Sequence, residues 1–154
     1  PVLIAGGTGV APLVALAEAL TKIRKNPYVI IGARTKAHII CEKEFRALRG
    51  GLKVATEDGS KGHRGLATDL LKKHLSASGP CPSAIYACGP TAMLKAVARI
   101  AESNNIPCQV SLEERMACGV GVCLGCPVKV RGRRESYKMV CKDGPVFDAR
   151  DILW

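Results

Sequence analysis

Continuous apolar runs alternate with amphipathic helical patterns through the first part of this 154-residue chain. The apolar runs fall at residues 2–5, 28–31, 52–55 and 84–88. A strand that is apolar at every position is covered on both faces, as in parallel sheets whose strands are joined by helices. The pattern therefore predicts an α/β fold with a parallel sheet and helices on both faces, and it places a ligand at the carboxyl ends of the strands.

The character of the chain changes at Ser111. The helical period disappears, and glycine and cysteine become frequent. Two short β-like segments, 128–130 and 137–140, flank the turn-like residues 131–134. We therefore expect two domains, an α/β domain over residues 1–110 and a small module containing a β-hairpin over residues 111–154.

Four cysteines in this second segment have a spacing typical of an iron-sulfur site. The order Cys118-x4-Cys123-x2-Cys126, followed at a distance by Cys141, fits the plant-type [2Fe-2S] pattern. Zinc is the alternative, but zinc ribbons usually pair two Cys-x2-Cys knuckles. A Rieske centre needs two histidine ligands, and all three histidines, His38, His63 and His74, lie outside this segment. The pattern favours a [2Fe-2S] cluster over zinc.

A glycine-rich turn between the first strand and the first helix predicts a dinucleotide site. It consists of Gly6, Gly7, Thr8 and Gly9, and Pro12 suits the first turn of the helix. Small residues at such a turn let backbone amides and the positive helix end approach a pyrophosphate. This turn alone is a weak signal, because it can also be explained by tight packing.

Two later strand ends strengthen the prediction of a nucleotide site. Cys88, Gly89 and Pro90 follow the strand at 84–88 and lead into a helix that contains Met93, and Arg34 follows the second strand. Arg34 suits a phosphate or ribose contact, with a solvated arginine as the alternative.

The end of the third strand leaves the choice of nucleotide open. Glu57 and Asp58 there favour an unphosphorylated ribose, whereas Lys61 and Arg64 suit a 2′-phosphate. Between NADH and NADPH we favour NADH, with Asp58 as a ligand.

Composition excludes several classes of protein. The formal charge is +10, but the basic residues are scattered and only 4% of residues are aromatic, so we expect no nucleic-acid binding. No apolar stretch approaches the length of a membrane span, so we expect no membrane association. The alternation of strands and helices argues against a disulfide scaffold and for metal-binding cysteines in a reducing cytoplasm. Pro1 leads directly into an apolar strand, which predicts a piece of a longer protein.

Three segments together resemble the ferredoxin-NADP reductase superfamily. They are the turn from Gly6 to Pro12, the segment from Cys88 to Leu94, and the cysteine module. The run from Ser111 to Cys123, together with residues 141–147, is similar to the electron-transfer subunit of B-type dihydroorotate dehydrogenase. The likeness covers essentially the whole chain.

This resemblance implies a set of cofactors and a partner. In that family an N-terminal β-barrel binds FAD, the α/β domain binds NAD, and the [2Fe-2S] cluster connects FAD to the FMN of a separate catalytic subunit in a heterotetramer. Electrons from dihydroorotate oxidation then pass through the cluster and FAD to NAD⁺, in pyrimidine biosynthesis. Because the cofactors carry this chemistry, we expect no catalytic acid or base in the chain.

The barrel that supplies the main FAD contacts is absent from this chain, so FAD binding is expected mainly outside it. The small subunit of an NADH-dependent ferredoxin-NADP reductase or of a sulfide dehydrogenase is the closest alternative, although aspartate often replaces the first cluster cysteine there, whereas this chain has Cys118. A zinc-stabilised nucleotide-binding module is a second alternative.

Overall fold

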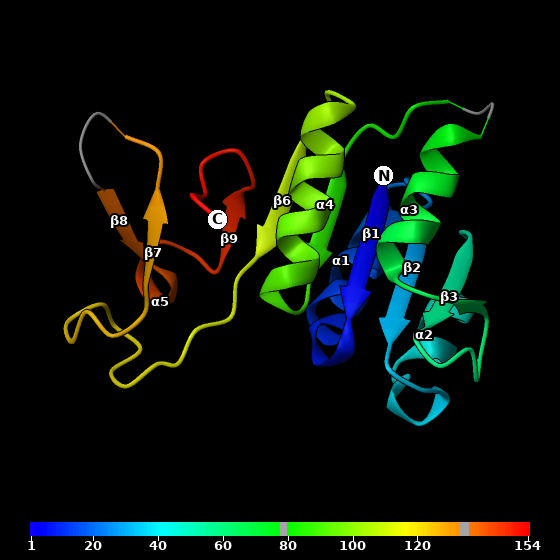
Figure 1. The fold of residues 1–154 in the computed structure, drawn as a ribbon, viewed down its shortest axis with the longest axis horizontal. Helices are drawn as coiled ribbons and strands as arrows, with labels where there is room; N and C mark the ends of the chain where they lie inside the picture. The colour runs from blue at the N-terminus through cyan, green and yellow to red at the C-terminus, as the bar shows by residue number, and fades with distance from the viewer. Residues whose placement is uncertain (78–79, 133–135) are drawn as a thin grey trace.

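A computed structural model describes residues 1–77, 80–132 and 136–154. Its main feature is a seven-stranded sheet in the order β4-β3-β2-β1-β5-β6-β9 (Figure 1). The strands are β1 (Val2–Gly6), β2 (Tyr28–Ala33), β3 (Leu52–Thr56), β4 (His63–Arg64), β5 (Ile85–Cys88), β6 (Cys108–Ser111) and β9 (Val146–Asp148). All neighbours pair in parallel except β6 and β9, which pair antiparallel.

Helices cover both faces of this sheet, as the apolar strands predict. The helices are α1 (Val10–Lys22), α2 (Glu42–Ala47), α3 (Ala67–Ser76) and α4 (Thr91–Ser103), with 3₁₀ turns η1 (Gly7–Gly9) and η2 (Lys36–His38). Residues of β1 alternate between the two faces. Leu3 packs in the core beneath α1 and α2, and Ile4 packs in the core beneath α3 and α4. Figure 1 shows α3 and α4 on the near face of the sheet.

The C-terminal segment forms a separate hairpin and then returns to the sheet. Strands β7 (Pro127–Val130) and β8 (Ser136–Met139) pair antiparallel, the one-turn helix α5 (Val140–Asp143) follows, and β9 then joins the edge of β6. Val140 and Phe147 belong to the same buried cluster as Leu94 of α4. The cysteine module and the α/β unit therefore share one hydrophobic core.

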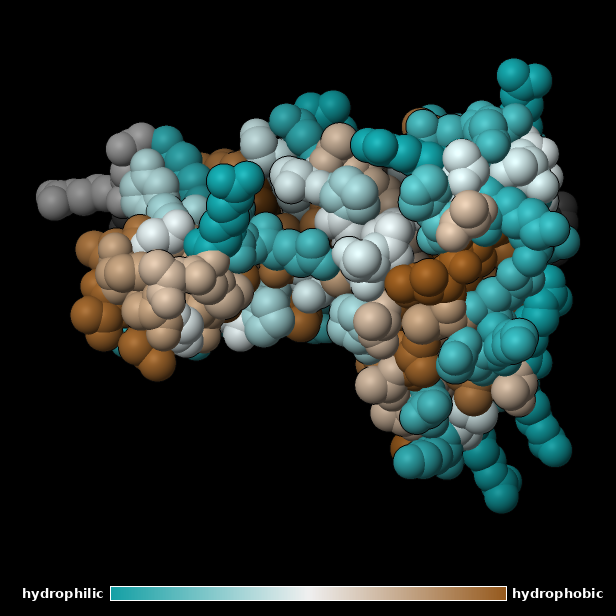
Figure 2. Space-filling view, turned by 90° about the horizontal axis from the view of Figure 1, so that it is seen from below, coloured by the Kyte–Doolittle hydropathy of each residue, from teal (hydrophilic) through white to brown (hydrophobic). Residues whose placement is uncertain are grey.

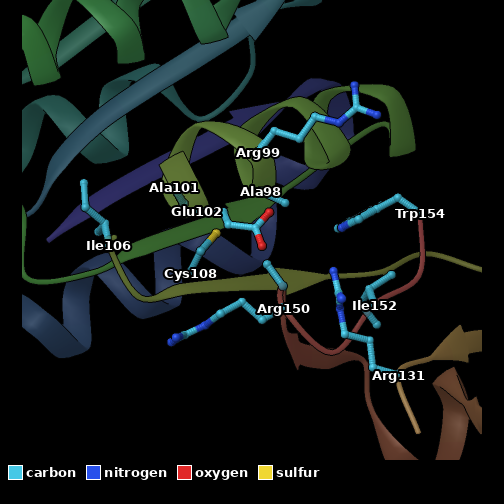
Figure 3. Close-up of a pocket in the computed structure, with 11 residues that line it drawn as sticks. Ala98, Arg99, Ala101, Glu102, Ile106, Cys108, Arg131, Arg150, Ile152 and Trp154 are labelled. Atoms are coloured by element: carbon cyan, nitrogen blue, oxygen red, sulfur yellow. The ribbon is translucent and has the colours of Figure 1, made fainter. Parts of the chain in front are cut away.

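Figure 3 shows the seam between α4 and the C-terminal tail. Ala98 and Glu102 on α4, Cys108 on β6, and Ile152 and Trp154 of the tail surround a cavity of about 30 Å³. That volume is close to one water molecule's share of the liquid. The cavity is thus a packing gap between the two parts of the chain and too small for an organic ligand.

The predicted α/β class, the parallel sheet and the hairpin strands are confirmed. Sequence reasoning did not identify β4, β6, α5 or β9, which have two to four residues each. The predicted turn at 131–134 lies partly outside the described residues, which exclude 133–135. Within the described residues, no helix has both the length and the apolarity to cross a bilayer.

Candidate functional site

A cavity of about 480 Å³ opens at the carboxyl ends of the parallel strands. Its walls come from the ends of β1 and β2 and from the first turns of α3 and α4. Strand order reverses direction between β1 and β5, which is the position where ligands bind in open α/β sheets. Figure 2 views the molecule from this edge of the sheet. The residues lining the cavity are Gly6, Gly7, Gly32, Ala33, Arg34, His38, Glu57, Gly65, Leu66, Ala67, Thr68, Pro90, Ala92, Met93 and Ala96.

Two glycines allow the loops after β1 and β5 to touch. A Cβ atom on Gly9 would lie 2.5 Å from the backbone carbon of Cys88. Gly89 has a φ of +150°, and a Cβ atom there would lie 2.9 Å from the Cα of Gly6. Contacts below 3.0 Å with backbone atoms leave no room for a side chain, so only glycine fits. The glycine-rich turn is thus required for packing, whatever it binds.

The predicted nucleotide residues divide into three groups. Gly6, Gly7, Arg34, Pro90 and Met93 line the cavity. The buried residues Gly9, Cys88 and Gly89 lie behind it, where they shape the junction of the two loops. The exposed residues Thr8, Pro12 and Asp58 do not line it.

The thiol of Cys88 is part of the core and not part of the cavity wall. Only 1% of Cys88 is exposed, and burial raises the pKa of its thiol. A hydrogen bond with the Ser111 side chain acts in the opposite direction, and the charge of Glu113 raises the pKa further. Since β5 and β6 pair Cys88 with Ser111, this contact joins the nucleotide edge to the strand that leads into the cysteine loop.

The charged residues after β3 differ in their position relative to the cavity, which the sequence alone did not predict. Glu57 lines the cavity. Asp58 instead accepts hydrogen bonds from the backbone N–H and hydroxyl of Ser60, at 2.9 and 2.6 Å, and these hydrogen bonds lower the pKa of its carboxyl. Lys61 forms an ion pair with Glu42, which also accepts a 2.7 Å hydrogen bond from Arg46. The positive charge of Lys61 is therefore paired with a carboxylate of the protein.

Sequence reasoning missed several lining residues, four of them at the start of α3. They are Gly32, Ala33, His38, Gly65, Leu66, Ala67, Thr68, Ala92 and Ala96. The signal that would have found them is topological. The helix after β3 and β4 begins at the same edge of the sheet as the glycine-rich turn, but β4 has only two residues and was not recognised as a strand.

The cysteine loop brings its sulfurs together in two pairs. Cys118 accepts hydrogen bonds at its sulfur from the backbone N–H of Cys123 at 3.4 Å and of Val120 at 3.5 Å. Led by the hydrogen bond from the Cys123 amide, these contacts, together with one from the Cys123 thiol, lower the pKa of Cys118 to about 6. Cys118 is thus prepared to act as a thiolate ligand.

The second pair consists of Cys126 and Cys141. A hydrogen bond to the Cys126 sulfur raises the pKa of the Cys141 thiol, and the charges of Cys126 and Cys118 raise it further. Cys126 is only 2% exposed, and its carbonyl accepts a 3.0 Å hydrogen bond from Val140, the residue before Cys141. The core and the first turn of α5 therefore fix this pair, while the first pair lies in the exposed loop.

The division into pairs distinguishes two kinds of metal centre. Among the described residues, no group of three or more His, Cys, Asp or Glu side chains surrounds a position for a single metal ion. A structural zinc site needs four ligands around one ion, whereas a [2Fe-2S] cluster held by four cysteines takes two sulfurs at each iron. Two pairs of cysteines thus suit the two irons of such a cluster, with one pair at each iron.

The cysteine loop also carries several exposed apolar side chains. Met116, Val120, Val122 and Leu124 are each between 49% and 78% exposed. Figure 2 shows an apolar patch on the lobe that the cysteine module forms. We call these four residues the loop patch. Large exposed apolar groups gathered in one loop are typical of a protein–protein contact.

The chain belongs to the family of oxidoreductase NAD-binding domains, whose family model matches residues 3–99. Residues 113–153 match a second model, the iron-sulfur cluster binding domain of dihydroorotate dehydrogenase B. The junction of the two matches lies close to the end of β6.

Similar proteins carry both segments in one chain. The chain is 40% identical over 97% of its length to the electron transfer subunit of dihydroorotate dehydrogenase B (NAD(+)) from Desulforamulus reducens. It is 42% identical over 99% of its length to the subunit of the same name from Caldanaerobacter subterraneus subsp. tengcongensis. These matches span 57% and 58% of the two relatives, so the chain corresponds to little more than half of each.

A solved structure of an NADH-dependent reduced ferredoxin-NADP oxidoreductase has the same fold. It superimposes with a TM-score of 0.85 at 36% sequence identity, covering 99% of this chain and 53% of that one. The likeness includes the cysteine module as well as the sheet.

Proposed function

We propose that this chain is part of an electron-transfer subunit that carries electrons from dihydroorotate oxidation, in a partner catalytic subunit, through a [2Fe-2S] cluster and FAD to NAD⁺. The main support for the proposal is that a candidate cluster site and a candidate nucleotide site are built on the same hydrophobic core. A two-pair cysteine loop and a cavity at the carboxyl edge of the sheet are joined by β6 and β9. The relatives named above contain both parts in the same order.

Specific residues would hold the two cofactors. For the cluster they are Cys118, Cys123, Cys126 and Cys141, in residues 111–154, the proposed cluster domain. For the nucleotide they are Gly6, Gly7, Arg34, Pro90 and Met93, in the proposed NAD domain, residues 1–110. Gly9, Cys88 and Gly89 support that site from behind. Thr8, Pro12 and Asp58 stay predictions.

The cluster, when bound, supplies one-electron transfer between two-electron carriers. The residues of the chain itself have other tasks. Backbone N–H groups of Val120 and Cys123 donate to the sulfur of Cys118 and so stabilise its thiolate, and Cys126 and Val140 anchor the loop in the core. At the sheet edge the glycine-rich loops orient the nucleotide. No side chain is assigned as a general acid or base.

We further propose that the loop patch contacts an FMN-containing catalytic subunit in a heterotetramer. The patch surrounds the exposed end of the cysteine loop, where a short route to a second protein is available. Most contacts to FAD would come from the part of such a protein that corresponds to the rest of the relatives' length. A cytoplasmic location, which the cysteine usage favours, stays a prediction.

Anaerobic co-purification of the full-length protein that contains this chain tests the proposal. We expect an FMN-containing partner, and we expect the complex to reduce NAD⁺ when dihydroorotate is added. A partner without dihydroorotate oxidation would contradict the substrate assignment. Zinc in place of iron and sulfide would contradict electron transfer altogether.

A second function is favoured by the structural comparison. The similarity to the NADH-dependent reduced ferredoxin-NADP oxidoreductase, with a TM-score of 0.85, supports a subunit that exchanges electrons between NADH and a ferredoxin-type partner. Reduction of a low-potential ferredoxin by the purified complex would favour this alternative, whereas reduction of NAD⁺ by dihydroorotate favours the first.

A further inference from the structure

We propose that the N-terminal end of α3, with the hydroxyl of Thr68, binds a phosphate group of the nucleotide. The sequence pattern had instead pointed to the glycine-rich turn before α1. The inference rests on the proposed nucleotide site and deepens it, because it states which groups of the cavity recognise which part of the ligand. It is carried by one buried side chain, two backbone amides and the shape of the cavity.

Among the residues that the structure describes, Thr68 is one of two buried polar or charged residues, and it is 7% exposed. It lines the cavity, yet its hydroxyl has no hydrogen-bond partner among the described residues. In the same part of the chain, every side-chain polar atom that is sealed from solvent has a hydrogen-bond partner. The hydroxyl of Thr68 therefore reaches the cavity and is free to donate to a ligand. A ligand in the cavity would give this hydroxyl the hydrogen-bond partner that the described part of the protein does not supply.

The first two backbone amides of α3 also lack hydrogen-bond partners among the residues described. Asp69 accepts a 2.8 Å hydrogen bond from the amide of Leu66, and the Asp69 amide donates to the Leu66 carbonyl at 3.0 Å. The amides of Ala67 and Thr68 have no acceptor in the described part of the chain. Unpaired amides at the start of a ten-residue helix form a site for an anion.

Gly32 brings this helix end to the edge of the sheet. A Cβ atom on Gly32 would lie 2.9 Å from the Cβ of Ala67, so a larger residue there would push α3 away from β2. The missing side chain places the first turn of α3 beside the end of β2, where Arg34 lies on the same cavity. Arg34 and Thr68 therefore line the same cavity, so that one ligand can reach both.

The turn before α1 offers less than the sequence suggested. Thr8 and Pro12 are exposed and do not line the cavity, and Gly9 is packed against the backbone of Cys88. Only Gly6 and Gly7 of this turn reach the cavity. The open space lies on the face of the sheet covered by α3 and α4. We therefore assign the phosphate to α3 and the close approach of the ligand backbone to Gly6 and Gly7.

The phosphate in question belongs either to the pyrophosphate or to a 2′-phosphate of the adenosine ribose. Isothermal titration of the full-length protein with ADP-ribose, 5′-AMP, 2′-AMP and adenosine separates these sources. The variant is Thr68→Val, which keeps the shape and removes the hydroxyl. Thr68→Ser retains the hydroxyl, and Ser76→Ala changes an exposed hydroxyl at the other end of α3.

We expect Thr68→Val to weaken about tenfold the binding of each ligand that carries the recognised phosphate, as for loss of a hydrogen bond to a charged group, and to leave adenosine binding unchanged. Thr68→Ser should stay within about threefold of wild type on the same scale, and Ser76→Ala should match wild type. A loss for ADP-ribose and 5′-AMP but not for 2′-AMP assigns the pyrophosphate, and a loss for 2′-AMP alone assigns the 2′-phosphate. Either result supports a phosphate subsite.

Two results would overturn the inference. Unchanged binding of ADP-ribose, 5′-AMP and 2′-AMP in a folded Thr68→Val protein would refute the subsite while leaving the nucleotide cavity in place. An equal loss for adenosine and ADP-ribose would show that Thr68 only shapes the cavity. If wild type binds none of these ligands, the proposed NAD site fails together with the inference.

Discussion

The edge of the sheet and the cysteine loop are built in opposite ways. At the edge, the ends of β1 and β5 are held by a core in which Leu3, Ile4 and Ile85 have no exposed surface. The cysteine loop, residues 112–126, contains no helix or strand, and most of its side chains are exposed. The nucleotide site is thus preformed by packing, whereas the metal site has few contacts of its own.

The two sites therefore owe their stability to different interactions. Burial of apolar surface fixes the strand ends before any ligand arrives. Of the four cluster cysteines, only Cys126 is buried, and the other three depend on hydrogen bonds and on the cluster to hold them together. Metal binding should therefore be part of folding for the loop and not for the sheet.

The largest effect should follow from Cys126→Ala, because this cysteine anchors the loop in the core. We expect iron and acid-labile sulfide in the purified protein to fall by roughly tenfold or more, since one of four ligands is lost. Cys81→Ala is the matched control, as Cys81 is an exposed cysteine outside the module. Normal cluster content in Cys126→Ala would remove Cys126 from the ligand set.

Removal of the cluster should affect the two regions very differently. Chelation under anaerobic conditions should increase amide hydrogen exchange strongly in residues 112–126 and leave β1 and β2 protected, because only the loop loses its ligand. Exchange detected by mass spectrometry gives both values in one sample. Equal loss of protection in β1 would show that the sheet and the cysteine loop unfold as one unit, and that both depend on the cluster.

A substitution at the sheet edge should cost stability without affecting the cluster. Gly9→Ala places a Cβ atom 2.5 Å from the Cys88 backbone, so we expect the free energy of unfolding to fall by about 1–3 kcal/mol. Gly7→Ala meets nothing within 4 Å and should cost about 1 kcal/mol for its positive φ alone. Denaturant titration checks both. A larger loss for Gly7→Ala would mean that the packing of Gly9 is unimportant.

The smallest effect concerns the two cysteine pairs in the cluster-free protein. Hydrogen bonds lower the pKa of Cys118 to about 6, so this thiol should be mostly ionised at pH 7, and its rate of alkylation should fall as the pH is lowered through about 6. The raised pKa of Cys141 keeps that thiol protonated at pH 7. Alkylation followed by peptide mapping should show Cys118 reacting severalfold faster. Faster reaction at Cys141 would contradict the hydrogen-bond arrangement.

The same contrast explains what the sequence could predict. Long apolar strands and helical spacing depend on local pattern, and they identified the sheet, its covered faces and the carboxyl edge. The cysteine spacing identified the candidate ligands. Thr68 and Glu57 were harder to place, because their position in the cavity depends on how β4 and α3 return to the edge. Asp58 looked equivalent to Glu57 in sequence, and only the turn that Ser60 closes separates them.

Electron exchange between a nucleotide at the sheet edge and a cluster at the cysteine loop can be observed by electron paramagnetic resonance of the anaerobic full-length protein after addition of NADH. We predict about two irons and two sulfides per chain and the signal of a reduced [2Fe-2S] centre once NADH is added. Bound zinc, or an iron centre that NADH leaves oxidised, would contradict the account.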